Sequence, residues 1–205
     1  MLKIKRLFDL VISLLLIVSF SPLMILISLA IKISSPGPII FRQKRLGENT
    51  KEFQIFKFRS MLVESEKQGT GLNSFEFDPR VTKVGKYLRS FSLDELPQLF
   101  NILRGDMSLV GPRPPVNYEL GGSEDSAEVP KKFRARFTLK PGLTGLAQIK
   151  GRNSLSWEDK NDLDLEYIRK FQRYGVFIDV YILVVTAVHV LLRKNILETR
   201  RDNES

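Results

Sequence analysis

The chain of 205 residues contains no cysteine and one histidine, His189. Without cysteine it has no disulfide scaffold, no iron–sulfur ligands and no thiol nucleophile. A zinc site with two or more His or Cys ligands is excluded, and a Ser-His-Asp triad would have to use His189. Any catalysis must therefore use carboxylates, lysine, arginine, hydroxyl groups or a hard metal ion such as Mg²⁺.

Glycine loops that bind phosphate are also missing. Neither GxxxxGK[ST] nor GxGxxG occurs, which disfavours a P-loop NTPase and a Rossmann enzyme. Positive charge is in excess: 32 Lys and Arg residues against 23 Asp and Glu residues give a net charge of +9. The partner is therefore expected to be anionic, such as nucleic acid, a phosphorylated substrate or lipid headgroups.

A run of 22 residues without a charge extends from Leu10 to Ile31. It is long enough to cross a bilayer and lacks the short apolar region and cleavage site of a signal peptide, so we expect it to be retained. Ser21 and Pro22 lie at its middle. Because Pro22 has no amide donor and disfavours helical geometry at Ser21, a kink or break is expected there.

Basic residues flank the run on both sides: Lys3, Lys5 and Arg6 precede it, and Lys32, Arg42, Lys44, Arg45 and Lys51 follow it. Positive residues favour the cytoplasmic side of a membrane, so a single span would leave one cluster on the wrong face. A helix–break–helix hairpin that enters and leaves one leaflet satisfies both clusters. A kinked span remains the alternative, and charge alone does not decide between them.

The soluble part begins with a pattern typical of a β-hairpin over residues 39–61. In its second strand Lys57 and Arg59 share one face, while Phe56 and Phe58 share the other. We expect the aromatic face to be buried and the two cations to point the same way. An ordinary solvated face is the competing interpretation.

A basic helix is predicted over residues 82–91, and the sequence Ser92-Leu93-Asp94-Glu95-Leu96-Pro97 follows it. Ser92 and Glu95 have capping-box spacing, and Asp94 is a good N-cap residue. Both carboxylates are thus expected at a helix N-terminus, where free amides stabilise an anion and can hold a phosphate. One acidic residue is enough to cap the helix, so capping does not explain why there are two. The second carboxylate, which has basic residues on both sides in the sequence, is expected to have another partner.

Arg113 lies between two prolines, which restrict the backbone, and a rigid arginine suits bidentate contact with a phosphate. A surface arginine in a turn is the simpler interpretation. Residues 117–132 are polar and acidic and are expected to form a mobile insertion. Residues 140–145 are a turn signal.

Two helices are predicted near the C-terminus. Residues 157–172 form a polar helix with Asp164 and Tyr167 on one side, and residues 176–192 form an apolar helix at a membrane interface or in the core. His189 lies in the second helix, where a packed or boundary role is expected.

At several of these motifs the chain closely resembles the monotopic phosphoglycosyl transferase family of bacterial sugar transferases. The resemblance covers residues 3–195 in the order of the family. The matching stretches are Ser21-Pro22, KFRSM at 57–61, DPRVTKVGKYLRSFSLDELPQLFN at 78–101, GDMSLVGPRP at 105–114, KPGLTGLAQIKGRN at 140–153, and the segment from Trp157 to Tyr167.

The resemblance implies an enzyme that transfers sugar 1-phosphate from a UDP-sugar to undecaprenyl phosphate and releases UMP. Asp94 would be the nucleophile that forms a phosphosugar–enzyme intermediate. Glu95 would help to hold Mg²⁺, together with Asp94, or handle protons. Residues implied to bind substrate are Lys57, Arg59, Arg89, Arg113, Gln148, Arg152, Asp164 and Tyr167.

The same resemblance implies a monotopic protein on the cytoplasmic face of the bacterial inner membrane, with Ser21 and Pro22 setting the topology. The expected fold class is α+β, mostly helical with a small β-hairpin and amphipathic interfacial helices. Residues 1–34 would form a re-entrant membrane hairpin. Residues 35–205 would form the catalytic part with a membrane-associated C-terminal helix. Membrane lipid is an expected partner, nucleic acid is not, and a homodimer is possible.

Two other functions fit parts of the sequence. A membrane-tethered nucleic-acid-binding protein would explain the net charge of +9, but it needs no dedicated acidic pair. A non-catalytic membrane adaptor could keep the fold, although the intact Asp94, Glu95 and Arg113 argue against it.

Overall fold

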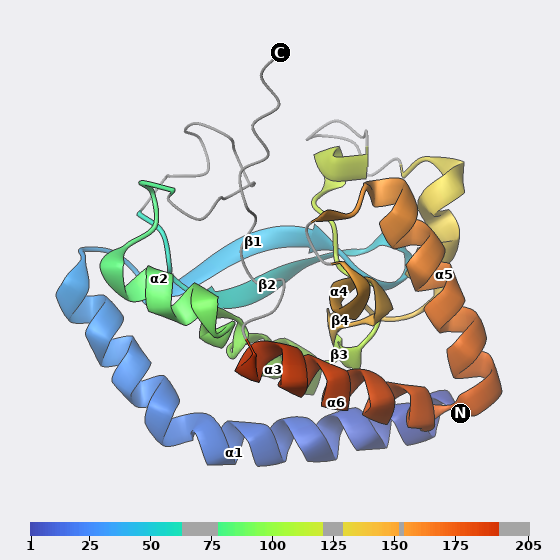
Figure 1. Ribbon diagram of the computed structural model, residues 1–205, viewed down its shortest axis with the longest axis horizontal. Coiled ribbons are helices and arrows are strands. Elements are labelled where there is room, and N and C mark those ends of the chain that lie inside the picture. Colours follow the sequence, from blue (N-terminus) through green and yellow to red (C-terminus); the bar gives the residue numbers. More distant parts are fainter. Residues whose placement is uncertain (63–77, 121–128, 152–153, 193–205) are drawn as a thin grey trace.

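The computed structural model describes residues 1–62, 78–120, 129–151 and 154–192. Helices dominate, and two small two-stranded sheets lie among them (Figure 1). The predicted α+β class is confirmed at this level. The elements are α1 (Leu2–Ser34), β1 (Ile40–Leu46), η1 (Glu48–Thr50), β2 (Glu52–Phe58), α2 (Lys83–Ser90), η3 (Leu93–Glu95), α3 (Gln98–Arg104), β3 (Ser108–Val110), η4 (Asn117–Leu120), η5 (Lys131–Thr138), β4 (Gly142–Thr144), α4 (Leu146–Lys150), α5 (Trp157–Tyr174) and α6 (Val176–Leu191).

The N-terminal apolar segment forms one helix of 33 residues, α1, with Pro22 inside it. Figure 1 shows that this helix bends along its length. Pro22 cannot donate to the carbonyl of Val18, and the Ser21 hydroxyl donates to that carbonyl instead, at 2.8 Å. The predicted kink is thus present, whereas the predicted break between two helices is not confirmed, because the helix continues through Ser21 and Pro22.

Many apolar side chains of α1 face outward: Leu14, Leu15, Val18, Ile25, Leu26 and Leu29 are each more than half exposed. Within the described residues, α1 is the one helix long and apolar enough to cross a membrane. So large an exposed apolar surface is typical of a segment that contacts lipid.

Both ends of α1 attach to the same globular part. Near its start, Arg6 donates to the carbonyls of Ile102 and Leu103 at the end of α3, at 2.6 and 3.0 Å. Past its other end, Arg59 donates to the carbonyls of Ser35 and Pro36, at 2.8 and 2.9 Å. The helix therefore bends over the globular part and returns to it.

The predicted β-hairpin is confirmed as the antiparallel pair β1–β2, in which Arg42 lies opposite Phe56. The aromatic face is buried at Phe58 as expected, but the opposite face is buried as well, so it is not an ordinary solvated face. Phe58 is 2% exposed on one face and Ile55 is 4% exposed on the other, because α1 and α2 pack on the first face and α3 on the second.

A second sheet, which was not predicted, pairs β3 with β4 in parallel. The two backbones approach so closely that a Cβ atom on Gly142 would lie 2.1 Å from the amide nitrogen of Gly111. Glycine is therefore required at this position. The strands are three residues each, too short to show alternation in the sequence.

The main core joins α3, β3, α4, α5 and α6. Its buried members are Ile55, Leu99, Ile102, Met107, Leu109, Val110, Leu146, Tyr167, Phe171 and Ile182. Helix α5 starts at a capping box in which the Ser156 hydroxyl accepts from the Asp159 amide at 3.0 Å. The sequence predicted both α5 and α6 within two residues at each end.

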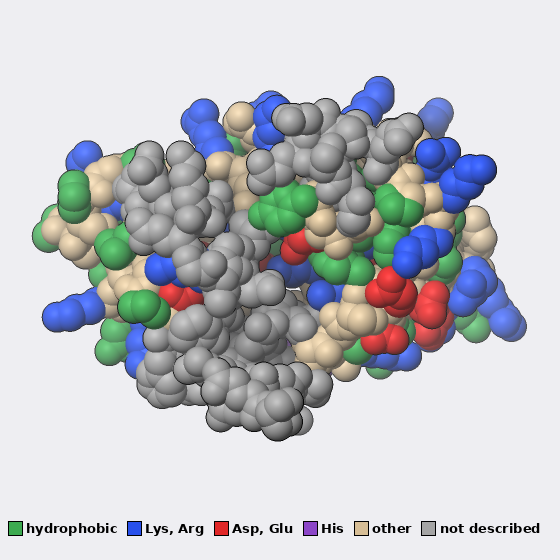
Figure 2. Space-filling view, turned by 90° about the horizontal axis from the view of Figure 1, so that it is seen from above, with side chains coloured by type: hydrophobic (Ala, Val, Ile, Leu, Met, Phe, Trp, Pro, Cys, Tyr) green, Lys and Arg blue, Asp and Glu red, His purple; other side chains and the backbone are tan. Residues whose placement is uncertain are grey.

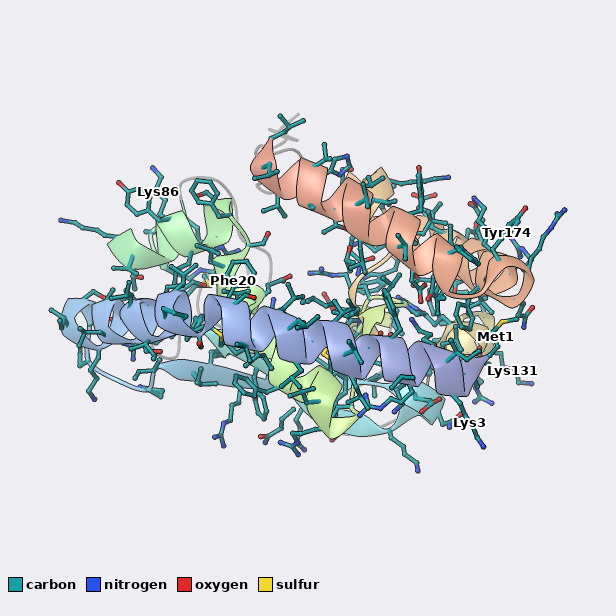
Figure 3. The ribbon with its side chains drawn as sticks, turned by 90° about the horizontal axis from the view of Figure 1, so that it is seen from below. Met1, Lys3, Phe20, Lys86, Lys131 and Tyr174 are labelled. Atoms are coloured by element: carbon teal, nitrogen blue, oxygen red, sulfur yellow. The ribbon has the colours of Figure 1, made fainter. Side chains whose placement is uncertain are left out.

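Helix α6 contacts α1 and lies on the same side of the molecule (Figures 1 and 3). Several of its apolar side chains are exposed, including Phe177 (80%), Tyr181 (57%) and Val184 (58%). One side of the molecule thus carries the outward apolar side chains of two helices. Insertion of α6 into an interface stays a prediction.

Candidate active site

Asp94 and Glu95 lie in η3, a single 3-10 turn between α2 and α3. The predicted capping box is wrong, since Ser92 forms no side-chain cap and has a left-handed backbone with φ of 53°. Helix α3 begins only at Gln98, after Pro97. The two carboxylates are therefore held by a tight, unusual turn, and left-handed non-glycine residues of this kind cluster at functional sites.

Lys57 of β2 reaches this turn. Its Nζ lies 2.9 Å from Oε1 of Glu95, and the two side chains are 21% and 16% exposed. Asp94 beside them is buried, at 9% exposure. The structure thus brings together Asp94, Glu95 and Lys57, three residues predicted for the site. The ammonium group offsets part of the negative charge that would otherwise repel an anionic substrate.

Arg59 and Arg89 have different surroundings. Arg59 is 5% exposed and its guanidinium caps the carbonyls that follow α1, so it fastens α1 to the hairpin. Arg89 lies in the last turn of α2. The pKa of Asp78 is held below its usual value, mainly by its hydrogen bond from Arg80 and in small part by the charge of Arg89. Arg89 is thus placed near the Asp78–Arg80 pair.

A second group of predicted residues gathers around the loop that follows β3. Arg136 of η5 donates to Oδ2 of Asp164 at 2.5 Å and to the carbonyl of Arg113 at 2.9 Å. Arg136 and Asp164 are both almost fully buried. Burial raises the pKa of Asp164 to about 6, and the attraction of Arg136 opposes this shift. Arg136 was not predicted as a site residue, because it lies in a basic stretch without periodicity.

Gln148 borders the same loop. A Cβ atom on Gly145 would lie 2.2 Å from the carbonyl oxygen of Gly111 and 2.8 Å from Oε1 of Gln148. Both amide atoms of Gln148 are buried without a hydrogen-bond partner among the described residues. Arg152, also predicted for the site, lies outside the described residues.

Tyr167 is part of the core. Its hydroxyl lies 2.8 Å from Oδ1 of Asp179 and 3.1 Å from the carbonyl oxygen of Val110. Burial raises the pKa of this phenol far above its usual value. The hydroxyl therefore stays protonated and ties α5 to β3 and α6.

A buried polar network around Lys5 was not anticipated either. Lys5 pairs with Asp179 at 2.6 Å, and Asp9 accepts from the Ser108 hydroxyl at 2.8 Å and the Leu109 amide at 3.1 Å. A signal was available: Lys5 and Asp9 are one helical turn apart, and Asp179 is the one carboxylate in apolar α6. A charge in such a helix usually has a buried partner.

The donor atoms at the candidate site fit Mg²⁺. Among the described residues no three His, Cys, Asp or Glu side chains form a cluster able to enclose a metal ion. Mg²⁺ is commonly held by one or two carboxylates together with substrate phosphates and waters. The adjacent carboxylates of Asp94 and Glu95 supply that smaller set.

Among the described residues, Lys and Arg side chains lie around much of the rim of the face opposite α1, and the largest group of Asp and Glu side chains lies at the right (Figure 2). With a net charge of +9, this distribution favours the approach of anionic substrates.

The profile of the family described as "Bacterial sugar transferase" matches residues 1–193. The chain belongs to the bacterial sugar transferase family. An undecaprenyl-phosphate glucose phosphotransferase of Komagataeibacter xylinus is 42% identical over 196 residues, which are 93% of this chain and 36% of that protein. The UDP-glucose:undecaprenyl-phosphate glucose-1-phosphate transferase of Escherichia coli K12 is also 42% identical, over 93% of this chain and 41% of that protein.

An uncharacterized sugar transferase of Bacillus subtilis is 38% identical over 96% of this chain and 91% of its own length. The chain thus spans well under half of the first two relatives and nearly all of this third one. The resemblance inferred from the motifs is confirmed at the level of the family.

Proposed function

We propose that the protein transfers sugar 1-phosphate from a UDP-sugar to undecaprenyl phosphate through a covalent intermediate on Asp94. The observation that carries this proposal is the turn η3, in which Asp94 and Glu95 are adjacent and Lys57 lies 2.9 Å from Glu95. The names of similar proteins support the substrate classes, since they include glucose and N-acetylgalactosamine phosphotransferases that act on undecaprenyl phosphate.

In the first step, a carboxylate oxygen of Asp94 attacks the β-phosphorus of the UDP-sugar. The bond from that phosphorus to the oxygen bridging the two phosphates breaks, and UMP leaves with the electron pair. The product on the protein is an acyl phosphate that carries the sugar. Lys57, which lies 2.9 Å from Glu95, reduces the repulsion between the carboxylate and the anionic pyrophosphate.

In the second step, a phosphate oxygen of undecaprenyl phosphate attacks the same phosphorus. The acyl phosphate bond breaks, Asp94 is released as a carboxylate, and the sugar is left on a lipid pyrophosphate. Mg²⁺ held by Asp94 and Glu95 would supply further positive charge at the pyrophosphate. Glu95, paired with Lys57, also orients the turn that presents Asp94.

The acceptor is confined to the bilayer, and the arrangement of α1 supports action at the membrane surface. Arg6 and Arg59 attach the two ends of α1 to one globular part, so a straight crossing would pull one end away from it. We place the protein on the cytoplasmic face of the inner membrane, with α1 entering and leaving one leaflet. Binding of nucleic acid is not favoured, because that function would leave both the acidic pair and the family membership unexplained.

The test is transfer of radiolabel from a panel of UDP-sugars to undecaprenyl phosphate, with release of UMP measured in parallel. We expect one or a few UDP-sugars to give a labelled lipid and an equal amount of UMP. A protein that consumes none of the panel, while a transferase relative assayed beside it is active, would contradict the proposal.

A further inference from the structure

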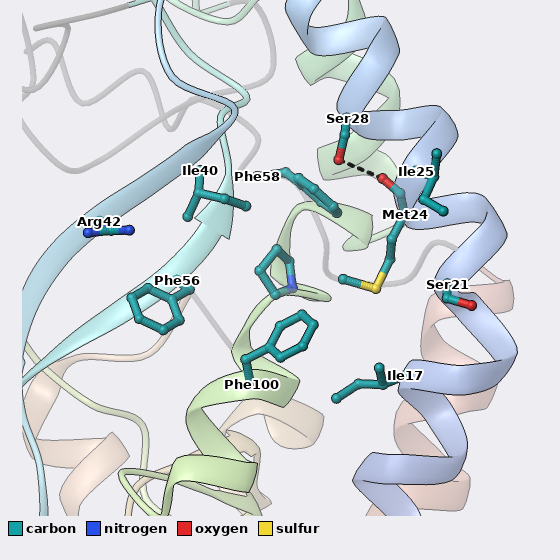
Figure 4. A pocket seen from close by; sticks show the side chains of 11 residues that line it. Ile17, Ser21, Met24, Ile25, Ser28, Ile40, Arg42, Phe56, Phe58 and Phe100 are labelled. Atoms are coloured by element: carbon teal, nitrogen blue, oxygen red, sulfur yellow. Dashed lines mark hydrogen bonds between the residues drawn. The ribbon is translucent and has the colours of Figure 1, made fainter.

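A cavity of about 450 Å³ lies between the inner side of the α1 bend, the β1–β2 hairpin and the start of α3 (Figure 4). Its volume is within the range of small-molecule sites, roughly 300–1,000 Å³. Met24 of α1 points into it toward Phe100 of α3, and Phe56 and Phe58 of β2 line another side.

The walls offer almost no free hydrogen-bonding group. Ser21 and Ser28 line the cavity, but their hydroxyls donate to carbonyls of α1 itself, at 2.8 and 2.7 Å. Pro97 has no amide hydrogen. A nucleotide or a sugar would lose hydrogen bonds to water here without replacing them. The cavity therefore suits a hydrocarbon.

One cation lies at this cavity without a compensating carboxylate. The guanidinium of Arg42 stacks near the ring of Phe56, with Cζ 5.6 Å from its centroid. It has no ion pair among the described residues, whereas Lys44 on the same strand pairs with Glu52 at 3.2 Å. A hydrocarbon cavity beside an unpaired cation is complementary to an amphiphile with an anionic head.

The position of the cavity links it to both the membrane and the carboxylate turn. Pro97 in its wall follows Glu95 by two residues. On the outer side of α1, Val18 and Leu26 are 64% and 62% exposed, so lipid is expected around the bend. A lipid ligand can therefore enter the cavity from the bilayer, and the wall of the cavity at Pro97 adjoins the carboxylate turn in the chain.

We infer that this cavity binds the isoprenoid units next to the phosphate of a polyprenyl phosphate, and that Arg42 faces the phosphate. The inference rests on the proposed function, in which undecaprenyl phosphate is the acceptor. An isoprenoid is the hydrocarbon we infer because the proposed acceptor carries one, and because Pro97 in the cavity wall follows the carboxylate turn by two residues.

The test places a photoreactive group in the cavity without adding bulk. The protein is produced with photo-methionine and placed in phospholipid nanodiscs that contain a small fraction of undecaprenyl phosphate. After irradiation, adducts on the Met24 peptide are identified by mass. In the matched variant Met24→Leu with Leu26→Met, the same group lies two residues away on the exposed side of α1.

We expect the Met24 peptide to carry undecaprenyl phosphate far above its share of the lipid, and position 26 to carry lipids in proportion to their abundance. Adducts at Met24 that match the bulk phospholipid would overturn the inference in favour of an acyl-chain pocket. Absence of any adduct at Met24, with labelling at position 26 intact, would overturn it as well.

Arg42 is tested by competition between undecaprenyl phosphate and undecaprenol for labelling at Met24. The preference for the phosphate should fall about tenfold in Arg42→Gln, because a charge-assisted contact is lost. An unchanged preference would contradict the role of Arg42. Labelling needs no turnover, so selective labelling without UMP release would sink only the proposed function, and transfer without selective labelling would sink only this inference.

Discussion

Lys5 near the start of α1 and Asp179 in α6 form an ion pair of 2.6 Å although 174 residues separate them in the sequence. Both side chains are buried, at 7% and 0% exposure. Lys5 also lies over the ring of Phe171, 5.4 Å from its centroid. The pair fixes how the apolar helix α1 lies against α6, because any other arrangement would leave a buried charge without a partner.

Lys5→Met is therefore expected to destabilise the protein by about 3–5 kcal/mol, since Asp179 would remain buried and unpaired. The double variant Lys5→Met with Asp179→Leu should be more stable than Lys5→Met alone. Thermal unfolding in detergent micelles measures both effects, with Lys3→Met as an exposed control. A double variant as unstable as the two single changes added together would contradict this role.

Lys57→Met should lower the transfer rate roughly 10- to 100-fold, because the charge that offsets the carboxylates of the turn is lost. Lys57→Arg should recover part of the rate. The control is Lys44→Met, which removes a lysine of the same hairpin whose ion pair with Glu52 is exposed. Equal rates for Lys57→Met and Lys44→Met would show that the pair with Glu95 has no part in the reaction.

Asp164 gives the protein a pH-dependent stability. Its pKa is raised from 3.8 to about 6, mainly by burial, so between these values the folded state holds a proton more tightly than the unfolded state. The free energy of unfolding should therefore fall as the pH rises from about 4 to about 6. Asp164→Asn should flatten this decline, and Asp162→Asn, an exposed change on the same helix, should not.

Thermal unfolding across that pH range supplies the measurement, and the slope is the quantity compared, because Asp164→Asn also alters the contact with Arg136. If the free energy of unfolding falls as steeply with pH in Asp164→Asn as in the natural sequence, another titrating group causes the pH dependence.

Local patterns in the sequence were enough to predict the hairpin and the helices α2, α5 and α6, because period and capping signals are local. Local patterns did not predict that Lys57 lies close to the acidic pair. Only the resemblance to the family assigned Lys57 to the same site. The face of β2 that carries Lys57 was predicted correctly from alternation, but its burial was not, since it depends on α3 packing against it.

Three features depend on contacts between distant segments and could not be read from the sequence. The sheet β3–β4 needs the close approach of Gly111 and Gly142. The capping box predicted at Ser92 does not form. Ser92 instead has a left-handed backbone, and the turn η3 that follows it packs on β2. The guanidinium of Arg59, a residue predicted to bind substrate, donates to the carbonyls that follow α1, a contact that no local pattern indicates.

Both ends of α1 are expected on the cytoplasmic side. The absence of natural cysteine allows this to be tested with Ile4→Cys and Glu48→Cys, one at each flank of the helix. Each single variant should be shielded from an impermeant reagent in spheroplasts and should react after the membrane is permeabilised. Reaction of only one of the two in sealed spheroplasts would indicate that α1 spans the membrane.

The role of Asp94 as nucleophile is tested most directly by the mass of the intact protein after incubation with its UDP-sugar and no acceptor. The natural sequence should gain the mass of one sugar phosphate, which is lost again when undecaprenyl phosphate is added. Asp94→Asn should gain none, because the amide has lost the attacking oxygen, and Glu95→Gln should gain it much more slowly. The same adduct on Asp94→Asn would contradict the account.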